Sequence, residues 1–220
     1  MMLNNSVLAI IYKDLLLEYR MKYAFNGVLL FLVSTIFVGY LSFAGAIDNA
    51  GWNALFWIIL LFTSVNVSLK SFVQERGGLQ LYFFILFRPQ WVIQAKIFYN
   101  AILLVILSIA GLAVFMLFFG NPIQNLPLFF VNMVVGVAGL SAILSMMSAI
   151  ASKAHNNFTL MSILSFPLVL PLLLVTIKTS LIAIEGGNFA EQWRDLVISF
   201  LLSAITFVMA NLLFPYIWRE

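Results

Sequence analysis

Six long apolar stretches dominate this sequence and restrict the chain to folds that are built in lipid. About 20 consecutive apolar residues, wound as an α-helix, cross a hydrocarbon core of roughly 30 Å. The composition agrees, since 64% of the residues are hydrophobic and 9% are charged, whereas a soluble domain is roughly 25% charged. We therefore predict an all-α membrane protein in which residues 1–220 form a single polytopic domain. The six predicted transmembrane helices cover about residues 23–46, 52–69, 92–119, 128–151, 158–183 and 196–216.

The segment of residues 5–22, which precedes the first span, is amphipathic. Its apolar residues recur at spacings of three and four, and charged residues occupy positions between them, a pattern typical of a helix lying in the membrane interface. We interpret this segment as an N-terminal interfacial helix, and a cytosolic extension of the first span is the alternative. The apolar positions are Leu8, Tyr12, Leu15, Leu16 and Tyr19, and the charged positions are Lys13, Asp14, Glu18, Arg20 and Lys22.

The distribution of Lys and Arg predicts how the chain crosses the membrane. With six spans, both termini lie on one side, and that side then holds nine of the eleven basic residues. Cytosolic loops carry the excess of Lys and Arg, so both termini and the connection between the second and third spans are predicted to be cytosolic. The nine residues are Lys13, Arg20, Lys22, Lys70, Arg76, Arg88, Lys96, Lys153 and Arg219, and the other two are Lys178 and Arg194.

The connection of residues 70–91 is much longer than the 2–8 residues that usually join helices in a bundle. Its centre, residues 79–87, is apolar but too short to span a membrane. Gly77 and Gly78 permit a sharp turn, and Pro89 disfavours helix in the residue before it. We interpret the connection as a cytosolic coupling segment, a short helix at the membrane face whose polar ends contact a soluble partner. A re-entrant or buried packing segment without a partner is the alternative.

Small residues recur along the fourth predicted span at spacings of three and four. Small faces let helices approach closely in lipid, where no hydrophobic effect drives their association. We therefore expect helix packing there, within the bundle or at a dimer interface, rather than substrate binding. The stripe consists of Ala138, Ser141, Ser145, Ala149 and Ser152, with Gly136 and Gly139 nearby.

Pro167 and Pro171 lie four residues apart in the fifth predicted span. Each proline removes a backbone hydrogen bond and bends a helix. The pair is a candidate hinge that moves during transport, and static shaping of the helix is the alternative.

Groups that could carry chemistry of their own are scarce. The sequence has no Cys and a single histidine, His155, on a predicted cytosolic loop, where we expect a solvated side chain rather than a haem or metal ligand. The motifs G-x-x-x-x-G-K-[ST], H-E-x-x-H and G-x-S-x-G are missing, so we predict no catalytic site and no enzyme activity. Any energy from ATP must then enter from another polypeptide. Within the spans, Asn66 and Asn211 are expected to bridge helices, and Lys178 to reach outward.

Two stretches of the sequence carry a resemblance to a known family. The run from residues 76–79 (RGGL) through Pro89 to residues 95–96 (AK) is similar to a family pattern of polar residues, G-x-L-E, a proline turn and A-K. Residues 163–173 (ILSFPLVLPLL) are similar to that family's paired-proline helix. Together with the length, the six spans and the interfacial helix, these stretches make essentially the whole chain resemble the CcmB family, the ABC-2-like "haem exporter protein B" permeases. Two departures are Gln80, where the family often has Glu, and Pro89, which stands alone where several prolines are common.

The resemblance implies the permease subunit of an ABC transporter complex for cytochrome c biogenesis, acting in haem export or in release of a haem-loaded chaperone. It further implies a homodimer in the bacterial inner membrane, with a CcmA-like ATP-binding subunit, a CcmC-like haem-handling membrane protein and a CcmE-like haem chaperone. ATP would bind to the partner subunit, haem is a candidate substrate, and this chain would bind no cofactor and no nucleic acid. The implied ATPase-coupling residues are Lys70, Glu75, Arg76, Gly77, Gly78, Leu79, Arg88, Pro89 and Lys96.

Two other functions fit the same sequence. One is an ABC-2 permease that moves a lipid, a drug or a glycan. The other is a membrane scaffold that assembles haem-handling proteins without transporting anything, and it predicts that function survives the loss of ATPase contact.

Overall fold

The computed structural model describes residues 3–21, 23–43, 47–73, 88–151 and 157–219. These residues form α-helices joined by short connections, with no strand among them. The helices are α1 (Leu3–Met21), α2 (Tyr23–Phe43), α3 (Asn49–Val73), α5 (Pro89–Phe119), α6 (Leu126–Ala151), α7 (Asn157–Ile184) and α8 (Phe189–Arg219).

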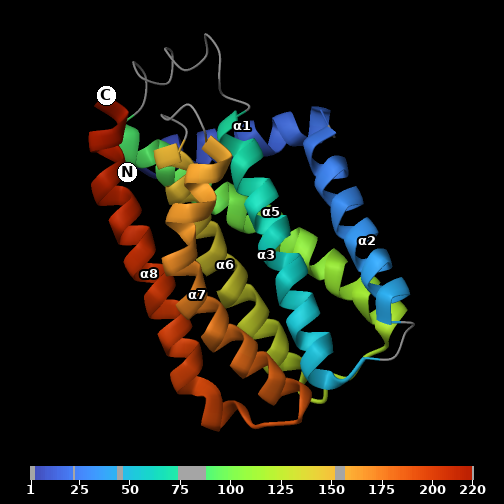
Figure 1. The fold of residues 1–220 in the computed structure, drawn as a ribbon. Helices are drawn as coiled ribbons and strands as arrows, with labels where there is room; N and C mark the ends of the chain where they lie inside the picture. Colours follow the sequence, from blue (N-terminus) through green and yellow to red (C-terminus); the bar gives the residue numbers. More distant parts are fainter. Residues whose placement is uncertain (1–2, 22, 44–46, 74–87, 152–156, 220) are drawn as a thin grey trace.

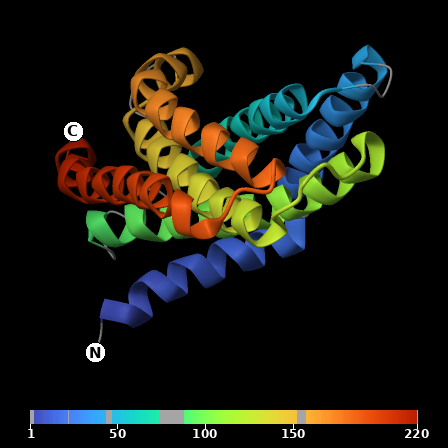
Figure 2. The ribbon, with the colours of Figure 1, turned by 90° about the horizontal axis from the view of Figure 1, so that it is seen from below.

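Six of these helices, α2 to α8, run between the two ends of one bundle, while α1 lies across one end of it (Figures 1 and 2). Within the described residues, these six helices are long and apolar enough to cross a membrane. The end that carries α1 also holds both ends of the chain (Figure 1), and we refer to it as the α1 end. The chain is therefore a multi-pass, all-α membrane protein, as its sequence predicts.

Several helices begin earlier than hydropathy predicts. α5 begins at Pro89 and α8 at Phe189, so residues 189–194, which lie between the fifth and sixth predicted spans, are helical. α3 begins at Asn49, three residues before the second predicted span, and the Asp48 carboxylate accepts a hydrogen bond of 3.2 Å from the Gly51 amide. Hydropathy marks only where a helix becomes apolar, whereas these helices continue into polar residues that suit a first turn, where amide hydrogens need acceptors.

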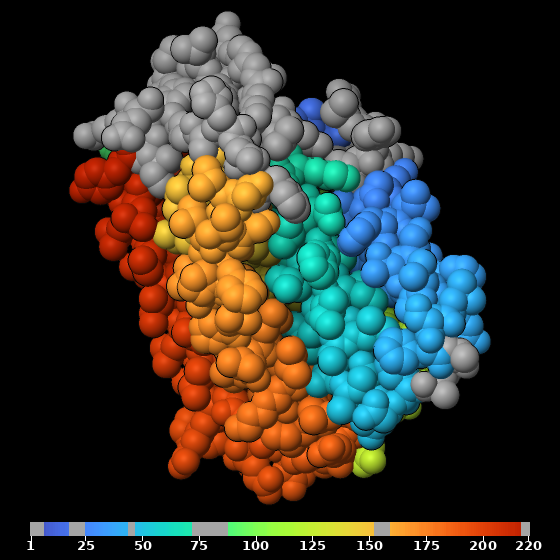
Figure 3. Space-filling model, viewed as in Figure 1, coloured from blue at the N-terminus to red at the C-terminus, as the bar shows by residue number. Residues whose placement is uncertain are grey.

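The helix α6 is the centre of the bundle. In the apolar 18-residue stretch of each helix, the buried share is 72% for α6, compared with 17% for α2 and 22% for α8. Little of α6 is visible on the face drawn in Figure 3. Ser141, Ser145 and Ala149 of the small-residue stripe are buried inside this chain. The stripe therefore serves helix packing, as predicted, but the three buried residues are not available to a dimer interface; Ser152 lies outside the described residues.

Two glycines of α6 allow the closest approach of neighbouring helices. A Cβ atom on Gly136 would lie 2.6 Å from the Trp57 ring of α3 and 2.9 Å from the Thr176 methyl group of α7. A Cβ atom on Gly139 would collide with Ser203 of α8 and would lie 2.8 Å from Leu172. Neither the indole ring nor the β-branched Thr176 can move aside easily in a packed interior.

We expect Gly136→Ala to lower the free energy of unfolding by about 1–3 kcal/mol, the usual range for overpacking a well-packed core. Thermal unfolding of the purified protein in mild detergent measures the effect. Gly111→Ala is the matched control, because its added Cβ would meet only the end of the Leu32 side chain, at 3.1 Å. Equal loss of stability in the two variants would contradict this packing account.

The helix α7 runs without a break from Asn157 to Ile184 through both of its prolines. Pro167 and Pro171 are both exposed on the outer side of the bundle, and neither can donate the hydrogen bond that a helical amide makes to the residue four positions before it. The paired prolines therefore lie on a lipid-facing side of a continuous helix, and their role as a hinge stays a prediction.

Candidate functional site

A buried ion pair fastens α1 to the rest of the bundle. The ammonium nitrogen of Lys96 on α5 lies 3.1 Å from a carboxylate oxygen of Asp14 on α1, and the two side chains are only 4% and 7% exposed. Asp14 follows Ile10 by one helical turn, and Ile10 is also buried against the bundle. Removing either partner from such a site would leave an uncompensated charge away from water, so the two residues depend on each other.

The same ammonium group also reaches α3. Lys96 donates a hydrogen bond of 3.1 Å to the backbone carbonyl of Ser71, in the last turn of α3. Carbonyl groups in the last turn of a helix lack partners within that helix, and the negative end of the helix dipole favours a cation there. One side chain of α5 therefore holds α1 and α3 together.

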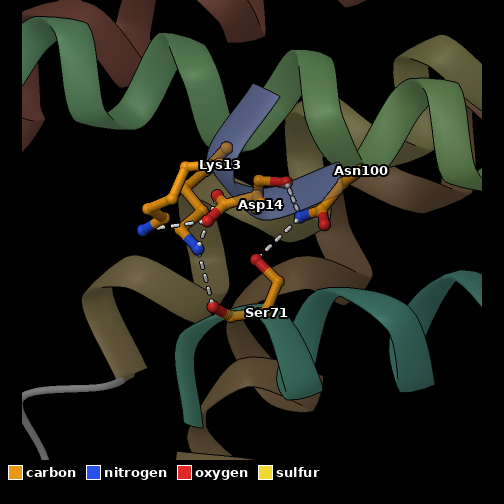
Figure 4. Close-up of polar contacts among 6 residues, drawn as sticks. Lys13, Asp14, Ser71 and Asn100 are labelled. Atoms are coloured by element: carbon orange, nitrogen blue, oxygen red, sulfur yellow. Dashed lines mark hydrogen bonds and ion pairs between the residues drawn. The ribbon is translucent and has the colours of Figure 1, made fainter. Parts of the chain in front are cut away.

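Amide and hydroxyl groups extend this contact into the centre of the bundle. The side-chain nitrogen of Asn100 on α5 donates to the hydroxyl oxygens of Ser71, at 3.3 Å, and of Ser145 on α6, at 2.8 Å. Ser148 of α6 donates to the carbonyl of Ser68 on α3, at 3.1 Å. We call the set Asp14, Ser71, Lys96, Asn100 and Ser145 the polar junction. Figure 4 labels Asp14, Ser71 and Asn100 of this set.

The outer edge of the polar junction is open. Lys13 places its ammonium nitrogen 3.0 Å from the other carboxylate oxygen of Asp14, and its side chain is 37% exposed. Asp14 thus lies between a buried cation and a partly exposed one. An exposed ion pair contributes little to stability, so Lys96 and Lys13 make unequal contacts with the same carboxylate.

The comparisons with known proteins identify the family. A family model described as CcmB protein matches residues 5–216 of the chain. The chain belongs to the CcmB family. A comparison with curated proteins finds no match. Membership of this family makes the chain a transmembrane permease component of the ABC type for cytochrome c biogenesis, with six membrane-spanning helices among its described residues.

In this CcmB family member, the predicted coupling segment joins α3 to α5. Lys70 is half-buried near the end of α3. Arg88 precedes α5 in an extended conformation (φ −68°, ψ 138°), and its guanidinium group lies 5.4 Å from the centre of the Trp91 ring. Pro89 occupies the first turn of α5, where its missing amide hydrogen costs no helical bond. The remaining predicted coupling residues, Glu75, Arg76, Gly77, Gly78 and Leu79, lie outside the described residues.

The surroundings of Lys96 differ from those that we predicted. We predicted it as a flank of the coupling segment that contacts a partner, whereas its side chain is buried and bonded to α1 and α3. The sequence did not identify Asp14 or Asn100 as site residues. The sequence does hold a signal for Asp14. Val7, Ile10, Ile11 and Asp14 follow one another at spacings of three, one and three, so they share a side of α1 that differs from the apolar stripe with Leu8 and Tyr12.

The described residues of that apolar stripe face away from the bundle, and the Tyr19 side chain lies outside the description. Leu8 and Tyr12 are 56% and 68% exposed, and Leu15 and Leu16 also belong to the exposed face. A helix that lies across the end of a membrane-spanning bundle and presents apolar side chains outward suits the lipid interface. The two sides of α1 therefore differ in kind: one holds the buried ion pair and the other offers hydrocarbon contacts.

Polar residues outside the polar junction also join helices to one another. Gln94 of α5 donates to Asn211 of α8 at 2.8 Å, which confirms that Asn211 bridges helices. Asn66 differs from this prediction, because within the described part of the chain its amide donates to the Phe62 carbonyl of its own helix, at 2.9 Å. Lys178 is 64% exposed and pairs with Asp195 of α8 at 2.9 Å, at the end of the bundle opposite α1.

Metal ligation has little basis in the part of the chain that the structure describes. No group of three His, Asp or Glu residues lies close enough together there to hold a metal ion. His155, the single histidine of the sequence, lies outside the described residues.

Proposed function

We propose that this CcmB family chain is the permease subunit of an ABC transporter complex for cytochrome c biogenesis, in which a separate ATPase acts on the coupling segment. The observation that carries the proposal is the polar junction. It joins α3 and α5, between which the coupling segment lies, at a single ammonium group. A force that a soluble partner applies to the segment would therefore be transmitted to the bundle through the contacts of Lys96 with α1 and α3.

The proposed assembly contains two copies of this chain and a CcmA-like ATP-binding subunit. A CcmC-like membrane protein and a CcmE-like chaperone would handle haem, and haem export or release of the haem-loaded chaperone is the step that ATP hydrolysis drives. The α1 end is proposed to face the cytosol of a bacterium, with the complex in its inner membrane. The sequence assigns nine of the eleven basic residues to that side, which supports this orientation by the positive-inside rule.

A genetic test addresses the pathway. A strain from which the gene for this chain has been deleted should lose its c-type cytochromes, measured by haem staining of membrane and secreted fractions, and the intact gene should restore them. Normal cytochromes in the deletion strain would favour a different ABC-2 substrate, such as a lipid, a drug or a glycan. Restoration by a chain that recruits no ATPase would favour the scaffold.

We expect Glu75→Ala with Arg76→Ala to reduce recovery of the ATPase with the purified chain by about ten-fold or more. Each charged contact contributes roughly 1.5–3 kcal/mol, and every 1.4 kcal/mol changes affinity ten-fold. Quantitative immunoblotting of the co-purified ATPase measures the loss. The matched control is Glu185→Ala with Arg194→Ala, which removes the same two kinds of charge from exposed residues at the opposite end of the bundle. Unchanged recovery in the first variant would remove both residues from the interface.

A further inference from the structure

We propose that Asp14 and Lys96 are positioning residues that transmit movement of the coupling segment to α1 and, through α1, to α2. This inference rests on the proposed function, because it assumes that an ATPase moves the segment. It adds a path within the permease: α1 becomes a moving part of the transport cycle, in addition to its contacts with lipid.

The first step of the argument is mechanical. Lys96 lies seven residues beyond Pro89, the first residue of α5, which corresponds to about 10 Å along the helix axis. Its ammonium group holds Asp14 of α1 and the Ser71 carbonyl of α3 at the same distance, 3.1 Å. A displacement of the first turns of α5 must therefore move α1 with it or break a buried ion pair.

The second step concerns the freedom of α1 and α2 to move. Only Lys22 separates α1 from α2, so the two helices are directly coupled along the chain. Only 17% of the apolar 18-residue stretch of α2 is buried, against 72% for the central α6. The outer side of α1 carries the exposed Leu8 and Tyr12. Lipid contacts give way readily, whereas the packed interior around α6 does not. The pair α1–α2 is thus a peripheral part of the bundle, and the buried α6 is the helix relative to which it would move.

The third step is the chemistry of the connection. An ion pair shielded from water interacts far more strongly than an exposed one, and the Lys96 and Asp14 side chains are both buried. Asn100 links the same end of α3 to α6 through Ser71 and Ser145. α3 shares the Lys96 ammonium group with α1, but it is also bonded directly to the central helix, because the Ser148 hydroxyl of α6 donates to the Ser68 carbonyl at 3.1 Å. The bond described above for α1 is to the first turns of α5. This difference predicts that α1, rather than α3, follows the coupling segment.

The test uses the absence of Cys from the sequence, which allows spin labels at chosen positions. The labels are attached at Tyr12→Cys, on the outer side of α1, and at Leu126→Cys, at the far end of α6. The native Tyr12 and Leu126 are 68% and 50% exposed. The labelled chain is purified with its co-purifying ATPase into lipid nanodiscs, and the distance between the labels is measured by pulsed electron resonance without nucleotide and with ATP and vanadate. We expect the distance distribution to shift on nucleotide trapping.

The variant that tests the Lys96–Asp14 ion pair is Asp14→Asn with Lys96→Met. It removes both charges, so neither is left buried without its opposite charge. We expect it to retain the ATPase and nucleotide hydrolysis but to lose the shift, together with c-type cytochrome assembly. Lys13→Met is the matched control and should keep the shift, because Lys13 binds the same carboxylate from an exposed position.

The outcomes separate the two proposals. If no ATPase accompanies the unmutated chain, the proposed function fails and this inference fails with it. If the ATPase is bound and active but the labels do not shift, or shift equally in the double variant, only the transmission through Asp14 and Lys96 is overturned. A double variant that no longer binds the ATPase would also overturn it, because the pair would then build the docking surface.

Discussion

Asp14→Asn alone should lower the free energy of unfolding by about 3–5 kcal/mol, the usual cost of breaking a buried ion pair from one side. The Lys96 ammonium group would stay buried beside the Ser71 carbonyl but would lose the opposite charge with which it pairs. A carbonyl dipole offsets only part of the cost of keeping a full charge away from water. Thermal unfolding in mild detergent, followed by Trp fluorescence, measures the loss.

Two companion variants make this prediction specific. Lys13→Met should change stability by no more than about 1 kcal/mol, because exposed ion pairs contribute little, although Lys13 lies as close to Asp14 as Lys96 does. Asp14→Asn with Lys96→Met should recover most of the lost stability, since replacing a buried pair by uncharged residues is often neutral. Equal effects of Lys13→Met and Asp14→Asn would show that burial does not distinguish the two cations.

Trp57→Ala should lower the free energy of unfolding by about 3–5 kcal/mol, the range for truncating a buried aromatic residue. Trp57 is 1% exposed and fills the space above Gly136 of α6. Its indole nitrogen donates to the Ser180 hydroxyl at 2.8 Å, and that hydroxyl lies 2.6 Å from the side-chain oxygen of Asn53, to which it donates. The substitution would open a cavity where α3, α6 and α7 meet and would take the indole donor from Ser180.

The control for Trp57→Ala is Trp193→Ala, at the exposed start of α8. Trp193 is 53% exposed, so its truncation should stay within about 0.5 kcal/mol of the unmutated protein. The same thermal unfolding measurement compares the two variants. Similar losses in both would mean that the tight contact at Gly136 does not govern the stability of the bundle.

The sequence is sufficient to predict the six spans, because apolar length is the dominant signal in lipid and needs no knowledge of neighbours. Helix ends are less predictable. Hydropathy places the start of the sixth span at residue 196, whereas α8 begins at Phe189, because the polar first turns of a helix can be satisfied at the interface. The small-residue stripe correctly predicts that α6 packs closely, but not that its partners belong to the same chain.

The polar junction could not be predicted from the sequence, and the reason is physical. Charge placement puts Lys96 at the level of the membrane face, but the positive-inside rule does not determine whether a side chain points to water, lipid or protein. α1 has apolar residues on two sides, and the stripe with Leu8 and Tyr12 is the longer one. The pairing of Asp14 with Lys96 depends on how α1 lies across the bundle, which is a property of the tertiary structure.

The most direct test of the central claim is purification of the tagged chain from its native membrane in mild detergent, with identification of every protein that accompanies it. The account predicts an ATPase with a Walker motif in stoichiometric amount, together with haem-handling membrane proteins of cytochrome c maturation. Recovery of the folded chain with such membrane proteins but without any ATPase would contradict the account, and would leave a scaffold as the function of this chain.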